Sequence, residues 1–363
     1  MSEPAAIVHD YLTQRGGAER VVLAMTRALP SAPLYTSVYL PGGTFPEFAD
    51  RAVRVTGLNR IPALRHYHRL DLPFLATAFS RLVVEAEVVI CSSSGWAHGA
   101  TVEGRKLVYC YTPARWLYES DRYLGRGSPL RRMALTALKP SLERWDRRAA
   151  ASAHRYLAIS RAVQERIRRA YGIESDILHP PHCMDPSAEV EAVDLEPGFL
   201  LSVSRLLPYK NLEAVVEAMG SLPGQRLVIV GGGPLAGRLR ARAAPHVTLL
   251  GVVTDAQLRW LYANCAGLVA ASHEDFGLTP LEAAAFGKPS AVLRGGGFLE
   301  TVVEEETGIF FRAPEPLLIQ KAVEALNRRD WAPGRLRAQA ERFSEDRFVA
   351  ALGQVVAEER ALV

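Results

Sequence analysis

The 363-residue sequence has few cysteines, no long apolar run and no leader-like start. A membrane-spanning helix needs about 20 successive apolar residues. A secretory leader needs a basic segment followed by an apolar one, and MSEPAAIVHDYL contains neither. The four cysteines, Cys91, Cys110, Cys183 and Cys265, form no CxxC pair and no cluster with histidines. We therefore predict neither a disulfide framework nor a metal site, and we expect a cytoplasmic protein.

Two classes of ligand-binding signature are also missing. The dinucleotide pattern G-x-G-x-x-G does not occur, which counts against a nicotinamide or flavin enzyme. The sequence contains no recognised DNA-binding motif, and its basic residues are not interleaved with the aromatic residues of a stacking platform. We therefore expect no nucleic-acid partner.

The nearly balanced charge conceals a local basic excess. The chain has 43 Lys and Arg against 39 Asp and Glu, a formal net charge of +4, but residues 105–175 hold 16 basic and six acidic residues. Such a stretch can contact the inner face of an anionic membrane or a phosphorylated acceptor, and it can equally be the solvated face of long helices. The arginines concerned are Arg131, Arg132, Arg144, Arg147, Arg148, Arg166, Arg168 and Arg169.

Short apolar segments alternate with amphipathic ones along the chain. We predict strands at 7–8, 86–91, 106–110, 199–204, 226–230, 247–250, 266–271 and 289–293. Helices are predicted from about 18, over 211–222, and from 255 to about 264 with Thr254 as the N-cap. Strands that are apolar throughout suit a parallel sheet covered on both faces, so we predict an α/β fold with doubly wound, Rossmann-like sheets.

One stretch interrupts this alternation. Residues 179–198 contain four prolines and no periodicity, as linkers do. We predict domains over 1–184 and 185–343, with a last helix at about 344–363 that can pack on either domain, including back on the first. Ligands of open parallel sheets bind beyond the carboxyl ends of the strands, so a cleft between two such domains is the expected binding site.

Candidate residues in the first domain follow its predicted strands. Gly16 and Gly17 precede the first helix, where a backbone can approach an anion closely, although a simple tight turn explains them as well. His98 lies among small residues in SSSGWAHGA, which predicts an exposed loop. Its imidazole could exchange a proton or bind a hydroxyl, or be an ordinary surface side chain.

Candidates in the second domain lie at corresponding strand ends. Arg205 and Lys210 follow the strand at 199–204, and two cations at this spacing can straddle a pyrophosphate. Two solvated surface charges are the alternative. Gly232 lies in the run Gly231–Pro234, which suits a backbone that closely approaches a nucleotide.

Two carboxylates lie in SHEDFGLTPLEAAAFGKP. Glu274 precedes Gly277 in a loop, where it can hold a polar ligand while the N–H groups of Leu278 and Thr279 hold phosphate oxygens. Glu282 has two interpretations. It could complete a T-x-x-E capping box with Thr279, or it could accept hydrogen bonds from a ribose.

The segment HEDFGLTPLEAAAFGKP resembles the glutamate-x7-glutamate motif of retaining glycosyltransferases of family four, which have the GT-B fold. The segments SRLLPYKN, VIVGGGPL, GVVTDAQLRWLYANC and GGGFLETVVEEETGIFF are similar to others of that family and stand in the same order. The resemblance implies two Rossmann-like domains whose parallel sheets face each other across a cleft. It implies a metal-independent enzyme that transfers a hexose from a nucleoside diphospho-sugar to a hydroxyl of a glycan, lipid-linked or small-molecule acceptor.

The resemblance also implies roles for individual positions. Arg205 and Lys210 would hold the donor diphosphate, Glu282 the ribose and Glu274 the donor sugar. Gly16, with Gly17 beside it, would approach the phosphate or sugar, and Gly232 would lie near the nucleotide. The backbone would contribute in two further places: Phe276, Gly277, Leu278 and Thr279 around the sugar, and Val252 and Val253 at the base.

One position departs from the family pattern. Tyr111, in VYCYTPARW, stands where many members have a histidine, and a phenol is a poor base near neutral pH. Tyr111 and His98 are therefore both candidates for that histidine's role. The other predicted catalytic residues are Glu274, Arg205 and Lys210. The segments SSSGWAHG and TPARWLY resemble a subgroup that acts on bacterial surface polysaccharides, often with GDP-mannose. The alternatives are a GT-B epimerase or phosphorylase, or a non-catalytic nucleotide-sugar-binding protein.

Overall fold

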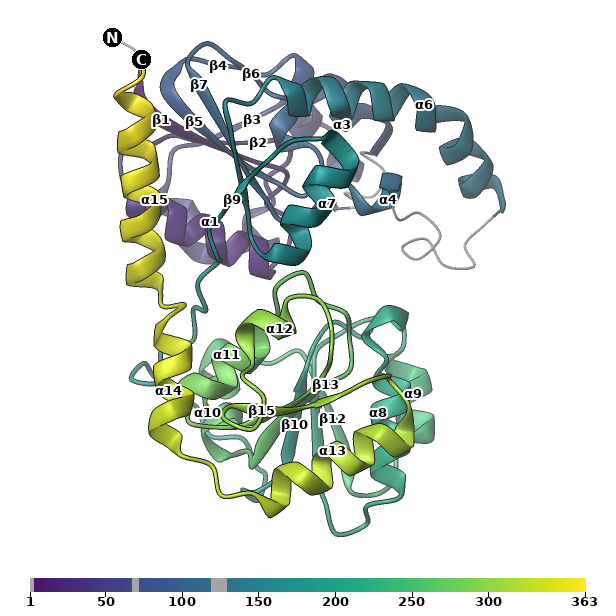
Figure 1. The fold of residues 1–363 in the computed structure, drawn as a ribbon. Coiled ribbons are helices and arrows are strands. Elements are labelled where there is room, and N and C mark those ends of the chain that lie inside the picture. The colour runs from purple at the N-terminus through teal and green to yellow at the C-terminus, as the bar shows by residue number, and fades with distance from the viewer. Residues whose placement is uncertain (1–2, 67–71, 119–128) are drawn as a thin grey trace. The chain divides into compact units, whose positions relative to one another are not determined.

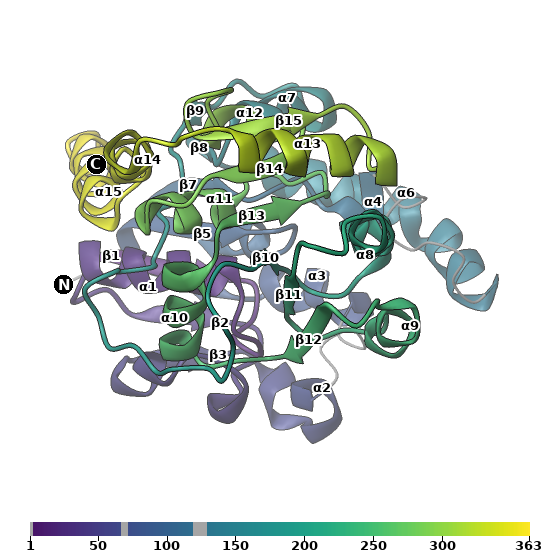
Figure 2. The ribbon, with the colours of Figure 1, turned by 90° about the horizontal axis from the view of Figure 1, so that it is seen from below.

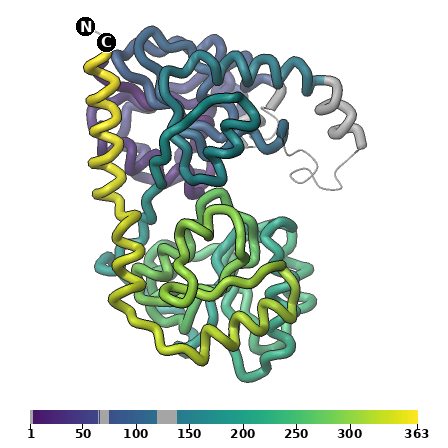
Figure 3. Tube along the Cα trace, viewed as in Figure 1, coloured from purple at the N-terminus to yellow at the C-terminus, as the bar shows by residue number. Residues whose placement is uncertain are grey.

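The computed structural model describes residues 3–66, 72–118 and 129–363. The chain divides into two compact units, unit 1 with Met1–Pro181 and Glu345–Val363, and unit 2 with His182–Ser344. Figure 3 follows the backbone out of unit 1 after Pro181 and back into it at Glu345.

Unit 1 is built on a parallel sheet that has seven strands within the described residues, in the order β3-β2-β1-β5-β7-β8-β9 (Figure 1). The central strands are buried throughout their apolar stretches, which confirms the predicted parallel sheet. The strands are β1 (Glu3–His9), β2 (Leu34–Thr36), β3 (Val53–Val55), β5 (Ala86–Ser93), β7 (Arg105–Cys110), β8 (Arg155–Ala158) and β9 (Asp176–Ile177). A small separate ladder pairs β4 (Val83–Val84) with β6 (Thr101–Val102).

The helices of unit 1 include the last one of the chain. Helix α15 (Glu345–Arg360) packs against α1 (Gly17–Ala28), and its Phe348 ring lies 5.8 Å from the ring of Tyr109 on β7. Ion pairs of 2.8 Å join Arg155 to Glu358 and Arg360 to Glu87. The other described helices are α2 (Pro62–His66), α3 (Leu72–Ser80), α4 (Arg115–Tyr118), α6 (Pro129–Ala151) and α7 (Arg161–Tyr171).

Unit 2 has a second parallel sheet, of six strands, in the order β12-β11-β10-β13-β14-β15. Its strands are β10 (Leu200–Val203), β11 (Leu227–Val230), β12 (Val247–Gly251), β13 (Gly267–Ala270), β14 (Ser290–Leu293) and β15 (Gly308–Phe311). The strand order reverses direction at the neighbouring pair β10 and β13. Loops that leave these two strands therefore diverge to opposite sides, and the crevice between them is the usual ligand site of such sheets.

Helices cover both faces of the unit 2 sheet (Figure 2). Helices α8 (Leu212–Gly220), α9 (Ala236–Arg242) and α13 (Pro316–Arg328) bury apolar residues on one face, and α10 (Asp255–Asn264) and α11 (Leu278–Ala285) on the other. Thr254 caps α10 in a full capping box with Gln257, which confirms the predicted N-cap. The remaining helices are α12 (Phe298–Thr301) and α14 (Pro333–Glu341).

Candidate functional site

The loop that follows β10 carries the two predicted cations of unit 2, and it is fixed at both ends. The Leu206 N–H donates to the Gly232 carbonyl at 2.8 Å. The Asn211 side-chain amide donates to the Ala271 carbonyl at 2.8 Å. Asn211 has a φ of 55°, in the left-handed region that asparagine tolerates better than most residues. A short 3-10 turn, Pro208–Lys210, lies between these two anchors.

Arg205 and Lys210 both contact one aromatic side chain in this loop. An Arg205 guanidinium nitrogen, Nη2, donates to the Tyr209 hydroxyl at 3.1 Å. The Lys210 ammonium lies 5.1 Å from the centroid of the Tyr209 ring, within the range of a cation–π interaction. Two cations and an aromatic ring held together in this way can bind a phosphate group.

Lys210 also forms an ion pair with Glu274, a residue of the loop that follows β13. The Ser272 hydroxyl donates to the same carboxylate oxygen, Oε1. The side chains of Lys210 and Glu274 are 12% and 23% exposed, so the pair is largely but not fully shielded from solvent. The structure therefore brings together a cation and a carboxylate whose relation no sequence spacing revealed.

Helix α11 begins close to this ion pair, directly after Gly277. Gly277 has a φ of 92°, and a Cβ at this position would lie 2.4 Å from the ring of Phe298. Glycine is therefore required here both by conformation and by space. The turn leads into the first turn of α11, where the N–H groups of Leu278 and Thr279 have no partner within the helix and favour an anion. Phe276, just before it, is buried with its ring 5.5 Å from that of Phe343.

The capping-box interpretation of Glu282 is wrong. Helix α11 begins at Leu278 after Gly277, one residue earlier than Thr279, and no side chain caps it. Thr279 therefore lies inside the helix. Glu282 instead accepts a hydrogen bond of 2.6 Å from the Tyr262 hydroxyl of α10, and it is 8% exposed. This bond holds the carboxylate of Glu282, in the middle of α11, in a defined orientation.

The glycine run after β11 is shaped by the neighbouring loop. Gly231 has a φ of 129°, and a Cβ there would lie 1.9 Å from the Ser204 carbonyl oxygen. At Gly232 the nearest side-chain atom to a Cβ would be Cγ2 of Val252, at 3.2 Å. Val252 is 83% exposed, whereas Val253 packs against the apolar core beneath α10. The structure therefore places Gly232 and Val252 side by side, with Val252 offering an apolar surface to a ligand.

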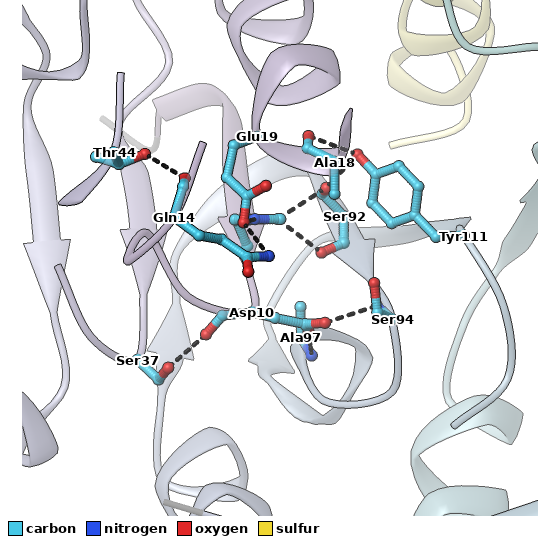
Figure 4. Close-up of polar contacts among 11 residues, drawn as sticks. Asp10, Gln14, Ala18, Glu19, Ser37, Thr44, Ser92, Ser94, Ala97 and Tyr111 are labelled. Carbon is cyan, nitrogen blue, oxygen red and sulfur yellow. Dashed lines mark hydrogen bonds and ion pairs between the residues drawn. The ribbon is translucent and has the colours of Figure 1, made fainter. Parts of the chain in front are cut away.

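In unit 1 the turn before α1 lies over a buried carboxylate (Figure 4). Glu19, in the first turn of α1, is 1% exposed and accepts a hydrogen bond of 3.1 Å from the Gln14 side-chain amide. A Cβ at Gly16 would lie 2.6 Å from its other oxygen, Oε2. A side chain at Gly16 would therefore require the Glu19 carboxylate to move, and Gly17 is the first residue of the helix.

A chain of hydrogen bonds runs from Tyr111 to the end of β1 (Figure 4). The Tyr111 hydroxyl donates to the Ala18 carbonyl at 3.1 Å, so it accepts from the Ser92 hydroxyl at 3.0 Å. The Ser92 hydroxyl in turn accepts from Nδ1 of His9 at 3.0 Å. The His9 Nε2 lies 3.9 Å from Glu19. Tyr111 thus connects β7 to the first turn of α1.

Asp10 follows His9 and is also buried. Its two carboxylate oxygens accept hydrogen bonds of 2.6 Å from the backbone N–H groups of Ser94 and Ala97. Burial raises the pKa of Asp10 above 3.8, while His9 and the two N–H groups oppose the rise. The carboxylate therefore ties the end of β1 to the loop after β5.

The prediction of an exposed loop at His98 is wrong. His98 is 2% exposed, with Nδ1 at 3.0 Å from the Ser93 hydroxyl and Nε2 at 3.0 Å from the carboxylate of Asp146 on α6. The small neighbours serve packing, since a Cβ at Gly99 would lie 2.4 Å from the ring of Trp145. His98 therefore joins α6 to the sheet instead of facing a ligand.

The same buried cluster contains two further polar groups. The Tyr118 hydroxyl donates to Asp146 at 2.7 Å, and burial together with this carboxylate raises the pKa of Tyr118. The Lys106 ammonium donates to the His98 carbonyl at 3.1 Å, and burial lowers the pKa of Lys106. The contacts of these groups all lie within unit 1, which is the pattern of a structural network.

The arginines of the basic stretch at residues 105–175 differ in the contacts they make. On α7, Arg168 and Arg169 each lie 2.9 Å from Glu165, which neutralises part of their charge. Arg166 lies 3.4 Å from the Thr112 hydroxyl. The side chains of Arg131 and Arg132 lie outside the described part of the chain.

Helix α6 carries the more open basic surface. Ser141, Arg144, Trp145 and Arg148 line a hollow on it, and we call these four residues with the 46% exposed Leu138 the α6 surface. Arg147, on the same helix, is also exposed. No helix within the described residues is both long enough and apolar enough to span a bilayer.

Sequence reasoning missed three residues that organise these sites. Tyr209 lies inside the segment SRLLPYKN, yet no spacing rule singles out a ring between two cations. Glu19 reads as an ordinary acid in a first helical turn, and only its burial distinguishes it. Asp146 looks like a solvated charge in a basic helix, but it is fully buried against His98.

Comparisons with known proteins match both units of the chain to glycosyltransferases. The family model described as "Glycosyltransferase Family 4" matches residues 15–187, and the model described as "Glycosyl transferases group 1" matches residues 185–343. The chain is similar to the human protein named alpha-1,3/1,6-mannosyltransferase ALG2, with 26% identity over 94% of this chain and 92% of that protein.

A second relative and a solved structure extend this picture. A Mycobacterium tuberculosis protein named GDP-mannose-dependent alpha-(1-6)-phosphatidylinositol monomannoside mannosyltransferase is 33% identical over 38% of this chain and 40% of its own. The crystal structure of Anabaena HepE with UDP and glucose has a TM-score of 0.72 at 17% identity, covering 98% of this chain and all of that one. The likeness to that structure extends over both units and shows a shared fold.

Proposed function

This chain belongs to glycosyltransferase family four, retaining hexosyltransferases of GT-B fold that use nucleotide-sugar donors, and we propose that unit 2 binds the donor around Lys210 and Glu274. The observation that carries this proposal is the meeting of three features in unit 2. They are the cations of the loop after β10, the carboxylate of the loop after β13, and the N-terminus of α11.

Each feature suits one part of a nucleoside diphospho-sugar. Arg205 and Lys210 would neutralise the diphosphate, with help from the N–H groups at Leu278 and Thr279. Glu274 would accept hydrogen bonds from hydroxyls of the sugar. Glu282, held in orientation by Tyr262, would accept hydrogen bonds from the ribose hydroxyls.

The glycines and valines complete the donor site in this proposal. Gly232 allows the backbone to approach the nucleotide, and the exposed face of Val252, with the backbone of Val253, would contact the base. Gly16 and Gly17 would approach the sugar or phosphate from unit 1. Because the carboxylate of Glu19 lies directly under Gly16, a sugar hydroxyl is a more favourable neighbour there than a second anion.

The reaction transfers the hexose with retention. The bond between the anomeric carbon and the diphosphate oxygen breaks, a bond to the acceptor oxygen forms on the same face, and the acceptor proton passes to the departing diphosphate. Arg205 and Lys210 would stabilise the charge that grows on that diphosphate. Since two protein cations are available for this purpose, we propose that the reaction requires no metal ion.

For the donor we propose GDP-mannose. Support comes from the human and mycobacterial relatives, both of which are named mannosyltransferases, one of them GDP-mannose-dependent. The acceptor in this proposal is a hydroxyl of a glycan or of a lipid-linked molecule. The α6 surface would hold the enzyme at the inner face of an anionic membrane, because it combines two guanidinium groups with an exposed leucine.

The donor proposal is tested by ligand-dependent thermal stability. The enzyme is heated with UDP-, GDP-, ADP- and dTDP-sugars, and a specific donor raises the melting temperature by mass action. We expect the largest shift with GDP-mannose, and Arg205→Ala and Lys210→Ala should each reduce it. If no sugar nucleotide shifts the melting temperature, or if both variants keep the full shift, the assigned donor site is wrong.

The membrane proposal is tested by flotation with vesicles that do or do not contain anionic lipid. Arg144→Ala with Arg148→Ala should reduce association with anionic vesicles, in a manner sensitive to salt. Arg168→Ala with Arg169→Ala is the matched control, since those arginines are paired with Glu165. Equal losses in the two double variants would contradict a specific role of the α6 surface.

A further inference from the structure

The Tyr209 side chain contacts both cations of the loop that follows β10. Its hydroxyl accepts the hydrogen bond from Arg205, and the face of its ring lies beneath the ammonium of Lys210. The two contacts use different parts of the residue. One needs the hydroxyl and the other needs only the aromatic ring.

Both cations sit on long, flexible side chains that need support. Arg205 is exposed, and its guanidinium donates a hydrogen bond to the Tyr209 hydroxyl. Lys210 has a second partner in Glu274, but that carboxylate is the group proposed for the donor sugar. When Glu274 turns to the sugar, the Tyr209 ring is the contact that remains. Preorganised cations bind an anion more tightly because less side-chain freedom is lost on binding.

The backbone around Tyr209 is itself held in place. Tyr209 is the middle residue of the 3-10 turn, and the Lys210 N–H donates to the Leu207 carbonyl at 3.0 Å. Asn211 closes the turn with its bond to the Ala271 carbonyl at the end of β13. A ring on such a turn is a firm support for its neighbours.

We propose that Tyr209 is a positioning residue that holds Arg205 and Lys210 ready for the donor diphosphate, an inference that rests on the proposed function. It acts through the two cations and not by touching the reacting atoms. The two halves of its role predict an order of effects. Phenylalanine removes the support of Arg205 alone, and leucine removes the support of both cations.

The test measures binding by isothermal titration calorimetry with UDP and GDP, using for all variants whichever binds the parent enzyme more tightly. Tyr209→Phe should weaken binding about threefold to tenfold, as expected for a typical exposed hydrogen bond that acts on the ligand only through Arg205. Tyr209→Leu should weaken it by about a further twofold to fivefold, as expected for the loss of the cation–π contact. Melting temperatures without nucleotide should stay close to that of the parent enzyme.

A double-mutant cycle separates positioning from a general structural effect. In an Arg205→Ala background, Tyr209→Phe should cause no further loss, because the group it supports is gone, whereas Tyr209→Leu should still cost the Lys210 contact. Tyr35→Phe is the matched control. Tyr35 lies on β2, its hydroxyl accepts from Arg54, and the guanidinium lies 5.2 Å from its ring. This control should leave nucleotide binding unchanged.

The outcomes distinguish this inference from the proposed function. If Arg205→Ala and Lys210→Ala do not weaken nucleotide binding, the donor site itself is misplaced. If they do, but Tyr209→Phe binds as the parent does, the positioning role is refuted and the donor site stands. A Tyr209→Phe effect that persists in full in the Arg205→Ala background also refutes it.

Discussion

Replacing Glu274 by glutamine should make the enzyme bind a nucleoside diphosphate more tightly and a nucleoside diphospho-sugar less productively. In the structure Lys210 is paired with Glu274, so a diphosphate must draw the ammonium away from the carboxylate before it gains the full interaction. Glutamine keeps the shape of the side chain but removes its charge. The variant therefore lowers the cost of recruiting Lys210.

The size of the gain follows from the setting of the ion pair. Opposite charges about 3 Å apart interact by about 5 kcal/mol at an effective dielectric constant of about 20. Most of that is offset by desolvation and by lost side-chain freedom, and measured values for exposed pairs lie near 0–1 kcal/mol. For this pair, with side chains 12% and 23% exposed, we expect about 1 kcal/mol, or about fivefold tighter binding of the diphosphate.

The expected loss of activity with the nucleotide sugar follows from the proposed contact between Glu274 and the sugar hydroxyls. A hydrogen bond to a charged group contributes about 1.5–3 kcal/mol, so kcat/KM for the nucleotide sugar should fall by at least about tenfold. The assay pairs calorimetry with nucleoside diphosphate and initial rates with the sugar nucleotide. Glu213→Gln is the control, since Glu213 is 29% exposed in ion pairs with Arg238 and Arg242 on the same unit. If Glu274→Gln weakens diphosphate binding as much as it slows transfer, the reasoning fails.

Three further substitutions test the buried polar contacts and the helix cap that the structure shows in the two units. Tyr262→Phe should lower the free energy of unfolding in urea by about 1–2 kcal/mol and weaken nucleotide binding, because the buried Glu282 loses a hydrogen-bond donor. Unchanged nucleotide affinity would contradict the assignment of Glu282 to the ribose. Thr254→Ala should lower the free energy of unfolding by about 1 kcal/mol through loss of the α10 cap, with nucleotide binding unchanged. Burial raises the pKa of Asp10 in the folded state, so its contribution to stability is fully present below the unfolded pKa of 3.8 and is lost as pH rises through the folded-state pKa. Asp10→Asn should remove that fall, and identical pH slopes in the two proteins would contradict it.

The strands of both sheets could be predicted from the sequence where they are buried on both faces. Strands β11 and β14 are apolar nearly throughout, and β5 and β7 each contain an apolar run of four residues, which is the signature of a covered parallel sheet. The edge strands could not be predicted in this way. β3 has three residues with a charged one at its centre, which is too short for any periodic pattern.

The sequence predicts that a boundary between two units exists, but it does not give the exact residue at which the chain divides. The proline-rich linker predicts a division near residue 185, and the structure divides between Pro181 and His182. The assignment of α15 needed the structure, because its contacts are with residues far away in sequence. Arg155 and Glu358, for example, are 203 residues apart and lie 2.8 Å from each other.

The candidate site shows where sequence reasoning stops. The order of strands in the sheet makes β10 and β13 neighbours, and this alone brings Lys210 to Glu274 across 64 residues. The T-x-x-E spacing at Thr279 failed for a local reason: the left-handed conformation of Gly277 starts the helix earlier, and Glu282 then meets Tyr262 from another helix. Spacing rules describe neighbours along one helix, whereas this carboxylate is placed by packing between two.

The two residues considered for the role of the family histidine are both held by hydrogen bonds within unit 1. The Tyr111 hydroxyl donates its hydrogen to the carbonyl of Ala18, so its proton serves to attach β7 to α1. His98 lies against Asp146 in the core. A transfer in which the acceptor proton leaves with the diphosphate needs neither side chain as a base. In the proposed reaction the stabilisation of the diphosphate then depends on Arg205 and Lys210, and Tyr209 contacts both of them, one through its hydroxyl and the other through its ring.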